Sequence, residues 1–296
     1  MPSKPIDAIA SVPTARAGTL GLRVLRSGID GGLECDDTVA VEAPLEFQLH
    51  HPALGAGPVS FGATMRTPGD DAALAAGLLY GEGLIEGPAD IDAIETSTRR
   101  PNVVNVRLKA SAAVDRRAEA RRFSAGSACG VCGTTGLDAA IARAAATRLP
   151  AGDAADLAVL LDLPRHMRDS QARFGTTGGI HAAAIFDFSG ALLGIAEDVG
   201  RHNALDKLIG ENLLAGRLPL ANRIVLLSGR ASFELVQKAL RAGAPVLAAI
   251  GAPSSLAVQL SAAAGLTLVG FLRDAHCNVY THRQRLQIGG TARSAN

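Results

Sequence analysis

The stretch that decides the fold is "RIVLLSGRASFELVQKALRAGAPVLAAIGAPSSLAVQLSAAAGLTLVGFLR", residues 223–273. Short uninterrupted apolar runs, typical of strands buried on both faces, alternate here with longer segments that have a helical apolar period. Strands linked by helices in this way form right-handed βαβ units around a parallel sheet. The sequence predicts strands over 223–229, 245–252 and 266–273, and helices over 232–243 and 255–265.

The segments before this stretch extend the same domain. Residues 179–198, "GIHAAAIFDFSGALLGIAED", predict a β-hairpin that turns at Ser189-Gly190. Residues 134–149 predict an Ala-rich helix with an apolar stripe. We therefore expect an α/β domain over residues 124–296, with a mixed or parallel sheet and helices on both faces.

The N-terminal part predicts a second, smaller unit. Residues 35–123 read as an α+β domain, with a helix that follows Asp70 and Asp71 and strands over 43–50, 59–66 and 102–110. Residues 1–34 lack the continuous apolar core of a secretory signal, and we interpret them as a flexible leader.

Composition excludes several classes of function. A net charge of +1 in 296 residues gives no bulk attraction to nucleic acid or to a membrane surface. Residues 242–272 carry no charge, but prolines at 245 and 253 interrupt them, and a soluble strand–turn–helix–strand unit fits better than a membrane span. We expect a cytoplasmic protein whose four cysteines are reduced thiols.

Polar and basic side chains follow the predicted strands. Because strands of this kind expose their carboxyl ends along one edge, ligands bind in the crevice there. Arginines, histidines and a helix start at this edge suggest an anionic ligand. The alternatives are that Ser232 and Ser255 only cap helices and that His202 is a surface histidine. The candidate residues are Arg201, His202, Arg230, Ser254, Ser255, Arg273 and His276.

Two of the four cysteines lie in "SACGVCG", residues 127–133. Cys129 and Cys132 lack the further ligands that a structural zinc site needs, so we expect no tightly bound metal. Two roles for these cysteines remain open. They form a dithiol redox pair, or they lie in a glycine-flanked loop that presents one thiolate. The arginine-rich segment 115–123 is either a solvated helix face or a basic group that lowers the pKa of these thiols. Cys35 and Cys277 read as ordinary thiols.

Several motifs together resemble the formate dehydrogenase accessory sulfurtransferases, the FdhD family. The resemblance runs from about residue 42 to about residue 282. The motifs "EDVGRHNALDKLIG" and "SGRASFELVQKA" are its most specific parts, whereas "CGVCG" alone is weak. The others are "TMRTPGDD", "TTGGIHAAAIF", "GAPSSLAV" and "TLVGFLR".

The resemblance implies a function. Family members accept sulfur as a persulfide from a cysteine desulfurase and transfer it to the molybdenum cofactor, bis(molybdopterin guanine dinucleotide), before its insertion into formate dehydrogenase. By motif match, Cys129 carries the persulfide and Cys132 is its partner. The resemblance also implies a homodimer and a cytidine deaminase-like α/β fold without zinc. The segment that matches the cofactor-binding segment of the family comprises Phe271, Leu272, Arg273, Asp274, Ala275 and His276.

One position departs from the family pattern. Many relatives have Arg where this chain has Ala196, so a neighbour such as Arg201 or Arg230 would have to contact the cofactor phosphates here. A non-catalytic cofactor chaperone and a thiol–disulfide oxidoreductase remain the alternative functions.

Overall fold

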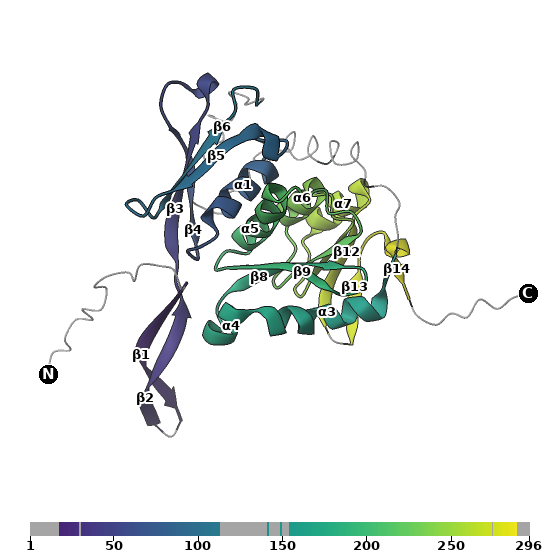
Figure 1. Ribbon diagram of the computed structural model, residues 1–296. Helices are drawn as coiled ribbons and strands as arrows, with labels where there is room; N and C mark the ends of the chain where they lie inside the picture. Colours follow the sequence, from purple (N-terminus) through teal and green to yellow (C-terminus); the bar gives the residue numbers. More distant parts are fainter. Residues whose placement is uncertain are drawn as a thin grey trace, which may run out of the picture.

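The computed structural model describes residues 18–29, 31–112, 141, 149, 154–273 and 275–288. Two bodies lie side by side, each with its own sheet, and a two-stranded hairpin extends from the smaller one (Figure 1). The predicted helix over 134–149 and the predicted domain boundary at 123–124 lie almost wholly outside the described residues.

The larger body is built on a six-stranded mixed sheet with the order β13-β12-β11-β10-β8-β9. The three central strands β10, β11 and β12 are parallel, which confirms the prediction from residues 223–273. The predicted hairpin is also present, as β8 and β9 in antiparallel register. The strands are β8 (His181–Asp187), β9 (Leu192–Asp198), β10 (Arg223–Leu227), β11 (Val246–Ala249), β12 (Thr267–Arg273) and β13 (His276–Val279).

Helices cover both faces of this sheet, as predicted (Figure 1). In β10, Val225 and Leu227 pack with helices α5, α6 and α7, whereas Ile224 and Leu226 pack with α3 on the opposite face. All four side chains are buried, which explains why the strand sequence is continuously apolar. The helices are α3 (Leu157–Ser170), α4 (Ala172–Thr177), α5 (Arg201–Leu214), α6 (Phe233–Arg241) and α7 (Ser255–Ala264).

The helix α3 is absent from the sequence prediction, although its local signals are clear in the structure. The Asp156 carboxylate caps it by accepting a hydrogen bond of 2.8 Å from the Ala158 N–H. Leu160, Leu163 and Met167 recur at helical spacing and are fully buried against the sheet. Pro164 lies inside this helix, and such an internal proline argues against a helix when the sequence is read alone.

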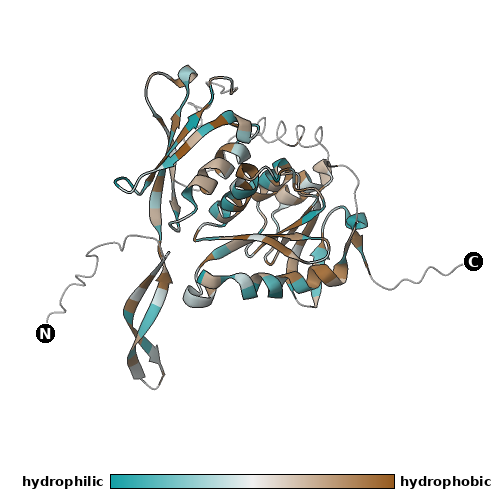
Figure 2. Cartoon of the chain, in the orientation of Figure 1, coloured by the Kyte–Doolittle hydropathy of each residue, from teal (hydrophilic) through white to brown (hydrophobic). Residues whose placement is uncertain are grey.

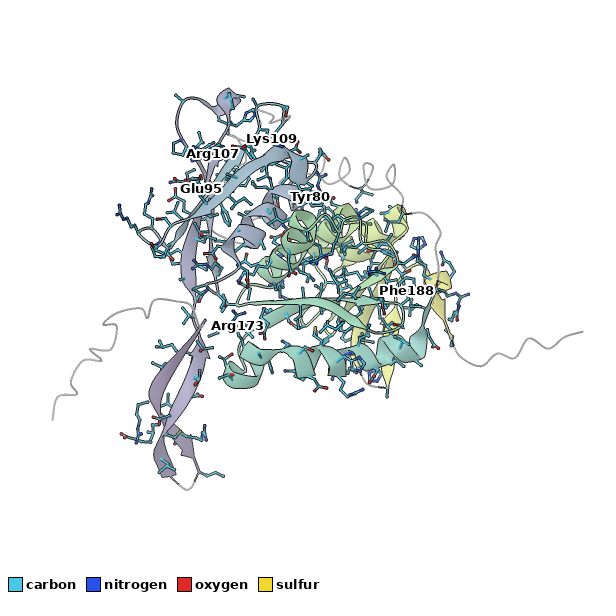
Figure 3. All side chains as sticks on the ribbon, in the orientation of Figure 1. Tyr80, Glu95, Arg107, Lys109, Arg173 and Phe188 are labelled. Carbon is cyan, nitrogen blue, oxygen red and sulfur yellow. The ribbon has the colours of Figure 1, made fainter. Side chains whose placement is uncertain are left out.

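The smaller body is a four-stranded sheet of order β4-β3-β6-β5 that packs against one helix. The predicted strands at 43–50 and 59–66, the predicted helix and the strand within 102–110 are all present, and β5 is an additional short strand. Arg107 and Glu95 form an ion pair of 2.9 Å across β6 and β5 (Figure 3). Its elements are β3 (Ala43–His50), β4 (Val59–Arg66), α1 (Asp71–Gly81), β5 (Ile91–Thr96) and β6 (Val103–Leu108).

The remaining elements are short, apart from the extended hairpin. Strands β7 and β14 pair in parallel beside the large sheet, and short 3₁₀ helices lie in loops of the described residues. Among the described residues, no helix is both long and apolar enough to cross a membrane. These elements are η1 (Pro52–Leu54), η2 (Pro88–Asp90), β7 (Ala155–Asp156), η4 (Arg283–Arg285) and β14 (Leu286–Gln287).

The hairpin corrects the prediction of a flexible leader over residues 1–34. Strands β1 (Thr19–Gly28) and β2 (Gly31–Ala40) pair along their whole length, so the prediction is wrong for residues 19–28 and 31–34. The signal in the sequence is the alternation of Leu20, Leu22 and Val24, which is the period of a strand with one apolar face.

Helices α1 and α5 join the two bodies through an unusually close crossing. A Cβ atom on Gly77 would overlap the Asp206 carbonyl, and one on Gly210 would overlap the Ala73 carbonyl. Glycine is therefore required at both positions for the helix backbones to approach. Beside the crossing, the buried Asp206 carboxylate accepts a hydrogen bond of 2.7 Å from Lys238 of α6.

Candidate functional site

The ends of six strands meet at one edge of the large sheet. Since β8 is antiparallel to both β9 and β10, strand β9 runs parallel to the central strands and ends at the same edge. Strands β8 and β13 begin there. The topology therefore brings the predicted candidates together: Arg201 and His202 after β9, Arg230 after β10, Ser254 and Ser255 after β11, and Phe271, Leu272, Arg273, Ala275 and His276 around the turn from β12 to β13.

Three loops at this edge touch through their backbones. The Gly251 N–H donates to the Gly229 carbonyl at 2.9 Å, and the Phe271 N–H donates to the Gly251 carbonyl at 3.1 Å. A Cβ atom on Gly251 would lie 3.0 Å from the Gly229 carbonyl, and one on Gly270 would lie 2.7 Å from the Pro253 ring. These glycines let the loops after β10, β11 and β12 form one continuous backbone surface.

The helix after β11 begins with a cap. Ser254 occupies the N-cap position, and its hydroxyl accepts a hydrogen bond of 3.2 Å from the Ala257 N–H. Ser255 is the first helical residue and is exposed. The capping role considered for Ser255 therefore belongs to Ser254, and the exposed N–H groups of the first turn face the edge.

His202 is not an isolated surface histidine. Its Nε2 lies 3.1 Å from a Glu234 carboxylate oxygen and 3.3 Å from the Ser232 hydroxyl, which links the start of α5 to the start of α6. This contact with His202 lowers the pKa of Glu234 to about 2, and burial opposes the shift. Ser232 holds the N-cap position of α6 but bonds Glu234 and His202 instead of the helix backbone.

Arg201 and His181 form the most distinctive part of the edge. The Nε of Arg201 is buried and has no hydrogen-bond partner among the described residues. The half-buried His181 begins β8, and its ring packs 3.4 Å from the position that a Cβ on Gly229 would take. Burial lowers the pKa of His181, and the nearby Arg201 guanidinium lowers it further. An anion placed here would meet both side chains.

His181 and Glu234 are absent from the residues predicted for the site. His181 lies in the motif "TTGGIH", where two glycines precede the strand, and this pattern reads equally well as a plain turn. Glu234 stands within the first turn of a helix, which is a common place for an acidic residue. The contact of Glu234 with His202, 32 residues away, has no local signature.

The motif "EDVGRHNALDKLIG" is mainly structural. The fully buried Asp198 carboxylate lies 2.8 Å from Lys207 Nζ and accepts a hydrogen bond of 3.1 Å from the Thr67 N–H. Lys207 also donates to the Thr67 carbonyl at 2.8 Å, and Asn203 donates to the Met65 carbonyl at 2.7 Å. These bonds attach the smaller body to the start of α5 and fix the position of Arg201 and His202.

The segment after β12 is divided between surface and core. Phe271 has a left-handed backbone, with φ 51°, and the residue is 38% exposed. Leu272 is fully buried in the core with α3, so only its backbone could meet a ligand. Arg273, Ala275 and His276 are exposed, and Asp274 lies outside the described residues.

The cysteine motif also lies outside the described residues, with Cys129 and Cys132 both in the interval 113–140. Cys35 and Cys277 are partly buried free thiols, and burial raises the pKa of Cys277. In the part of the chain that the structure describes, no group of three or more His, Cys, Asp and Glu side chains is arranged to hold a metal ion.

Comparison with known proteins gives consistent matches. The model of the FdhD/NarQ family matches residues 40–287. The chain is 45% identical over 263 residues to the sulfur carrier protein FdhD of Streptomyces coelicolor, a match that covers 85% of this chain and 90% of that protein. It is 41% identical over 251 residues to the sulfur carrier protein FdhD of Sulfurisphaera tokodaii, covering 85% and 92% of the two chains.

A solved structure has the same fold. The crystal structure of a proposed formate dehydrogenase accessory protein from Desulfotalea psychrophila superimposes with a TM-score of 0.69 at 25% identity. The match covers 91% of this chain and 99% of that one. It therefore includes both bodies.

Proposed function

Because the chain belongs to the FdhD/NarQ family, we propose that it is a sulfur carrier that serves formate dehydrogenase. The observation that carries this proposal is the match to sulfur carrier proteins across 85% of the chain. We propose more specifically a cytoplasmic sulfurtransferase, with Cys129 as the persulfide-carrying cysteine and Cys132 as its partner. A cytidine deaminase-like fold of the larger body belongs to the same proposal, and the mixed sheet with helices on both faces is compatible with it.

The loading step requires a donor that already holds a persulfide. The Cys129 thiolate attacks the outer sulfur of a cysteine desulfurase persulfide, a new S–S bond forms on Cys129, and the desulfurase cysteine leaves as a thiolate. No net oxidation occurs, because the sulfur atom passes between two thiols. Since only the thiolate is nucleophilic, arginines such as Arg121 and Arg122 would favour this step by lowering the pKa of Cys129.

The delivery step returns Cys129 to its starting state. The outer sulfur leaves as a sulfur atom, the S–S bond breaks, and Cys129 keeps the electron pair as a thiolate. The sulfur becomes a sulfide by taking two electrons from the metal centre of the cargo, the molybdenum cofactor bis(molybdopterin guanine dinucleotide). In this proposal the metal is part of the substrate, and the protein holds no metal of its own.

The sheet edge suits the anionic parts of this cargo. A dinucleotide carries pyrophosphate groups, and the edge presents Arg201, Arg230 and Arg273 together with the first turns of α5 and α7. The strongest single feature is the buried Nε of Arg201, which has no hydrogen-bond partner among the residues that the structure describes, since a buried donor of this kind is normally bonded. Because position 196 holds alanine in this chain and not arginine, we propose that Arg201 binds the phosphates of the cofactor.

A complementation experiment distinguishes a protein that carries sulfur from one that only carries the cofactor. A Cys129→Ala/Cys132→Ala variant is expressed in cells that lack the native protein, and formate dehydrogenase activity is measured. We expect activity to be lost, whereas a Cys35→Ala/Cys277→Ala variant should retain it. Normal activation by the first variant would favour a cofactor chaperone instead. A reversible Cys129–Cys132 disulfide in a protein that never carries persulfide would favour a thiol–disulfide oxidoreductase.

A further inference from the structure

The starts of helices α5 and α6 place a carboxylate among basic side chains. Glu234 stands in the first turn of α6, and Arg201 and His202 are the first two residues of α5. Figure 2 shows hydrophilic residues on both helices, whereas strand β10, which precedes α6, is mainly hydrophobic. These side chains therefore lie at the edge where the strands of the large sheet end. The acidic group is unexpected there, because the edge otherwise presents arginines that attract anions.

Glu234 keeps its negative charge at neutral pH. The hydrogen bond with His202 is the main cause that lowers its pKa to about 2, and Ser232 and the nearby Arg201 lower it as well. The group is therefore only an acceptor of hydrogen bonds. Its charge also repels phosphate, so Glu234 weakens the binding of a ligand that carries nothing but negative charge.

One of the two carboxylate oxygens already has its partners. Oε2 of Glu234 lies 3.1 Å from Nε2 of His202 and accepts a hydrogen bond of 3.2 Å from the Ser232 hydroxyl. Among the residues that the structure describes, none donates a hydrogen bond to Oε1. The Glu234 side chain is 33% exposed, so a ligand can reach this oxygen. Oε1 therefore has room for the hydrogen-bond donors of a ligand.

The contacts of Oε2 fix the carboxylate between the starts of two helices. His202 belongs to α5, whereas Ser232 is the N-cap residue of α6 and bonds Glu234 instead of the helix backbone. An acidic residue that only stabilises the positive end of a helix does not need such contacts. A group that is held in place before the ligand arrives loses less conformational entropy on binding. This arrangement favours a role for Glu234 in binding.

We infer that Oε1 of Glu234 selects the ring system of the ligand by accepting hydrogen bonds from a 2-amino-4-oxopyrimidine. Such a ring presents a ring N–H and an amino N–H side by side, and both can point at one carboxylate. The inference rests on the proposed function, because the proposed cargo contains this ring in two places, the guanine base and the pterin. It adds the residue that recognises the ring.

A pair of donors explains why a carboxylate stands among arginines. The phosphates of the ligand meet the cationic side chains and the two N–H groups meet Glu234, so each part of the ligand faces its complement. Adenine fits this edge poorly, since its corresponding ring nitrogen has no hydrogen to donate and turns a lone pair toward the carboxylate. Glu234 therefore rejects adenine nucleotides as well as attracting guanine-like rings.

A series of nucleoside diphosphates tests the selection in the unmodified full chain. Isothermal titration calorimetry measures the dissociation constants of guanosine, inosine and adenosine diphosphate (GDP, IDP and ADP) at one salt concentration. IDP lacks the amino group, and ADP lacks both donors at these ring positions. One hydrogen bond to a charged group corresponds to about a tenfold change in affinity. We expect GDP to bind about 10-fold more tightly than IDP and on the order of 100-fold more tightly than ADP.

Substitution of Glu234 separates selection from a merely structural role. Glu234→Gln keeps the shape of the side chain but removes its charge, and it should reduce the preference for GDP over ADP from on the order of 100-fold to below about tenfold. A structural defect would instead weaken the binding of all three nucleotides by the same factor. Glu211→Gln is the matched control, because the exposed Glu211 carboxylate pairs with Arg217 at 3.0 Å toward the other end of α5. It should leave the preference unchanged.

A free pterin distinguishes the two sources of the ring. If the guanine base meets Glu234, the nucleotide preference depends on Glu234 as described above. If the pterin meets it, the three nucleotides bind alike, but 6-hydroxymethylpterin binds about tenfold more weakly to Glu234→Gln than to the wild type, as measured by pterin fluorescence. The inference is overturned if Glu234→Gln changes neither the nucleotide preference nor the binding of the pterin. A wild type that binds the three nucleotides alike and does not bind the pterin overturns it without any variant.

These measurements can fail independently of the proposed function. Binding of a nucleotide or a pterin involves no sulfur transfer, and far-ultraviolet circular dichroism checks that each variant is folded. A protein that carries sulfur on Cys129 but binds these ligands without any dependence on Glu234 would contradict this inference alone. A protein that selects guanine through Glu234 but never carries sulfur would contradict the proposed function alone.

Discussion

Glu234 and His202 show how single residues set the properties of the sheet edge. They come from different helices, and their contact at 3.1 Å orients the imidazole beside Arg201. The pKa of His181 is lowered by burial and, in addition, by the Arg201 guanidinium, because a nearby cation disfavours the charged imidazole. The edge therefore holds one carboxylate that stays ionised and one imidazole that tends to stay neutral.

Glu234 predicts a specific dependence of stability on pH. Its pKa is lowered from 4.5 to about 2 in the folded protein, mainly by the hydrogen bond with His202. A lowered pKa stabilises the fold fully above the unfolded value of 4.5, and this contribution is lost as the pH falls toward 2. Wild type should therefore exceed Glu234→Gln in free energy of unfolding at neutral pH, and the difference should shrink between these two values. Urea titrations at several pH values measure it, and a difference that stays constant with pH would contradict the assignment.

His181 reports on charge at the edge. Substituting Arg201→Gln removes a cation beside it and should raise its pKa toward 6.5, as measured by NMR titration of the imidazole proton resonances. Arg230→Gln is the matched control, because Arg230 is exposed and is not among the charges that shift His181. Guanosine diphosphate, a fragment of the proposed cargo, should also raise the pKa of His181 if its phosphates bind here. An unchanged pKa in both experiments would argue against an anion site at this position.

At the scale of elements, the crossing of α1 and α5 holds the edge in place. Helix α5 carries Arg201 and His202 at its first turn, and its position depends on α1 through the close approach at Gly77 and Gly210. The Asp198, Lys207 and Thr67 contacts add a buried polar connection at the same junction. A change in this crossing would move the start of α5 and therefore the edge itself.

Gly210→Ala tests the importance of this crossing. The added methyl would overlap the Ala73 carbonyl, so the helices must separate, and we expect a loss of about 1–3 kcal/mol in the free energy of unfolding. Gly175→Ala is the matched control in helix α4, where a Cβ meets no atom within 4 Å. That change should be neutral or stabilise the fold by up to about 1 kcal/mol. Equal effects of the two substitutions in chemical denaturation would contradict the role of Gly210.

At the scale of the whole molecule, the sequence predicts the strands of the large sheet better than it predicts the contacts between the two bodies. Strands β10 to β12 could be recognised because burial on both faces makes them continuously apolar, and their shared edge followed from their direction. The junction could not be predicted, since Thr67 and Asp198 are 131 residues apart and no local pattern links them. The hairpin of β1 and β2 has a weaker signal, since it consists of only two strands and its alternating apolar residues lie in an N-terminal segment that also fits a leader. Recognition of the family from the ordered motifs is confirmed.

The central claim is that Cys129 carries sulfur. The most direct measurement is mass spectrometry of the intact protein and its peptides after incubation with a cysteine desulfurase and ³⁴S-labelled cysteine, with persulfides trapped by alkylation. We expect the mass of one labelled sulfur atom on the peptide that contains Cys129, and its loss in Cys129→Ala but not in Cys35→Ala. Labelled persulfide retained at the wild-type level in Cys129→Ala would contradict the account.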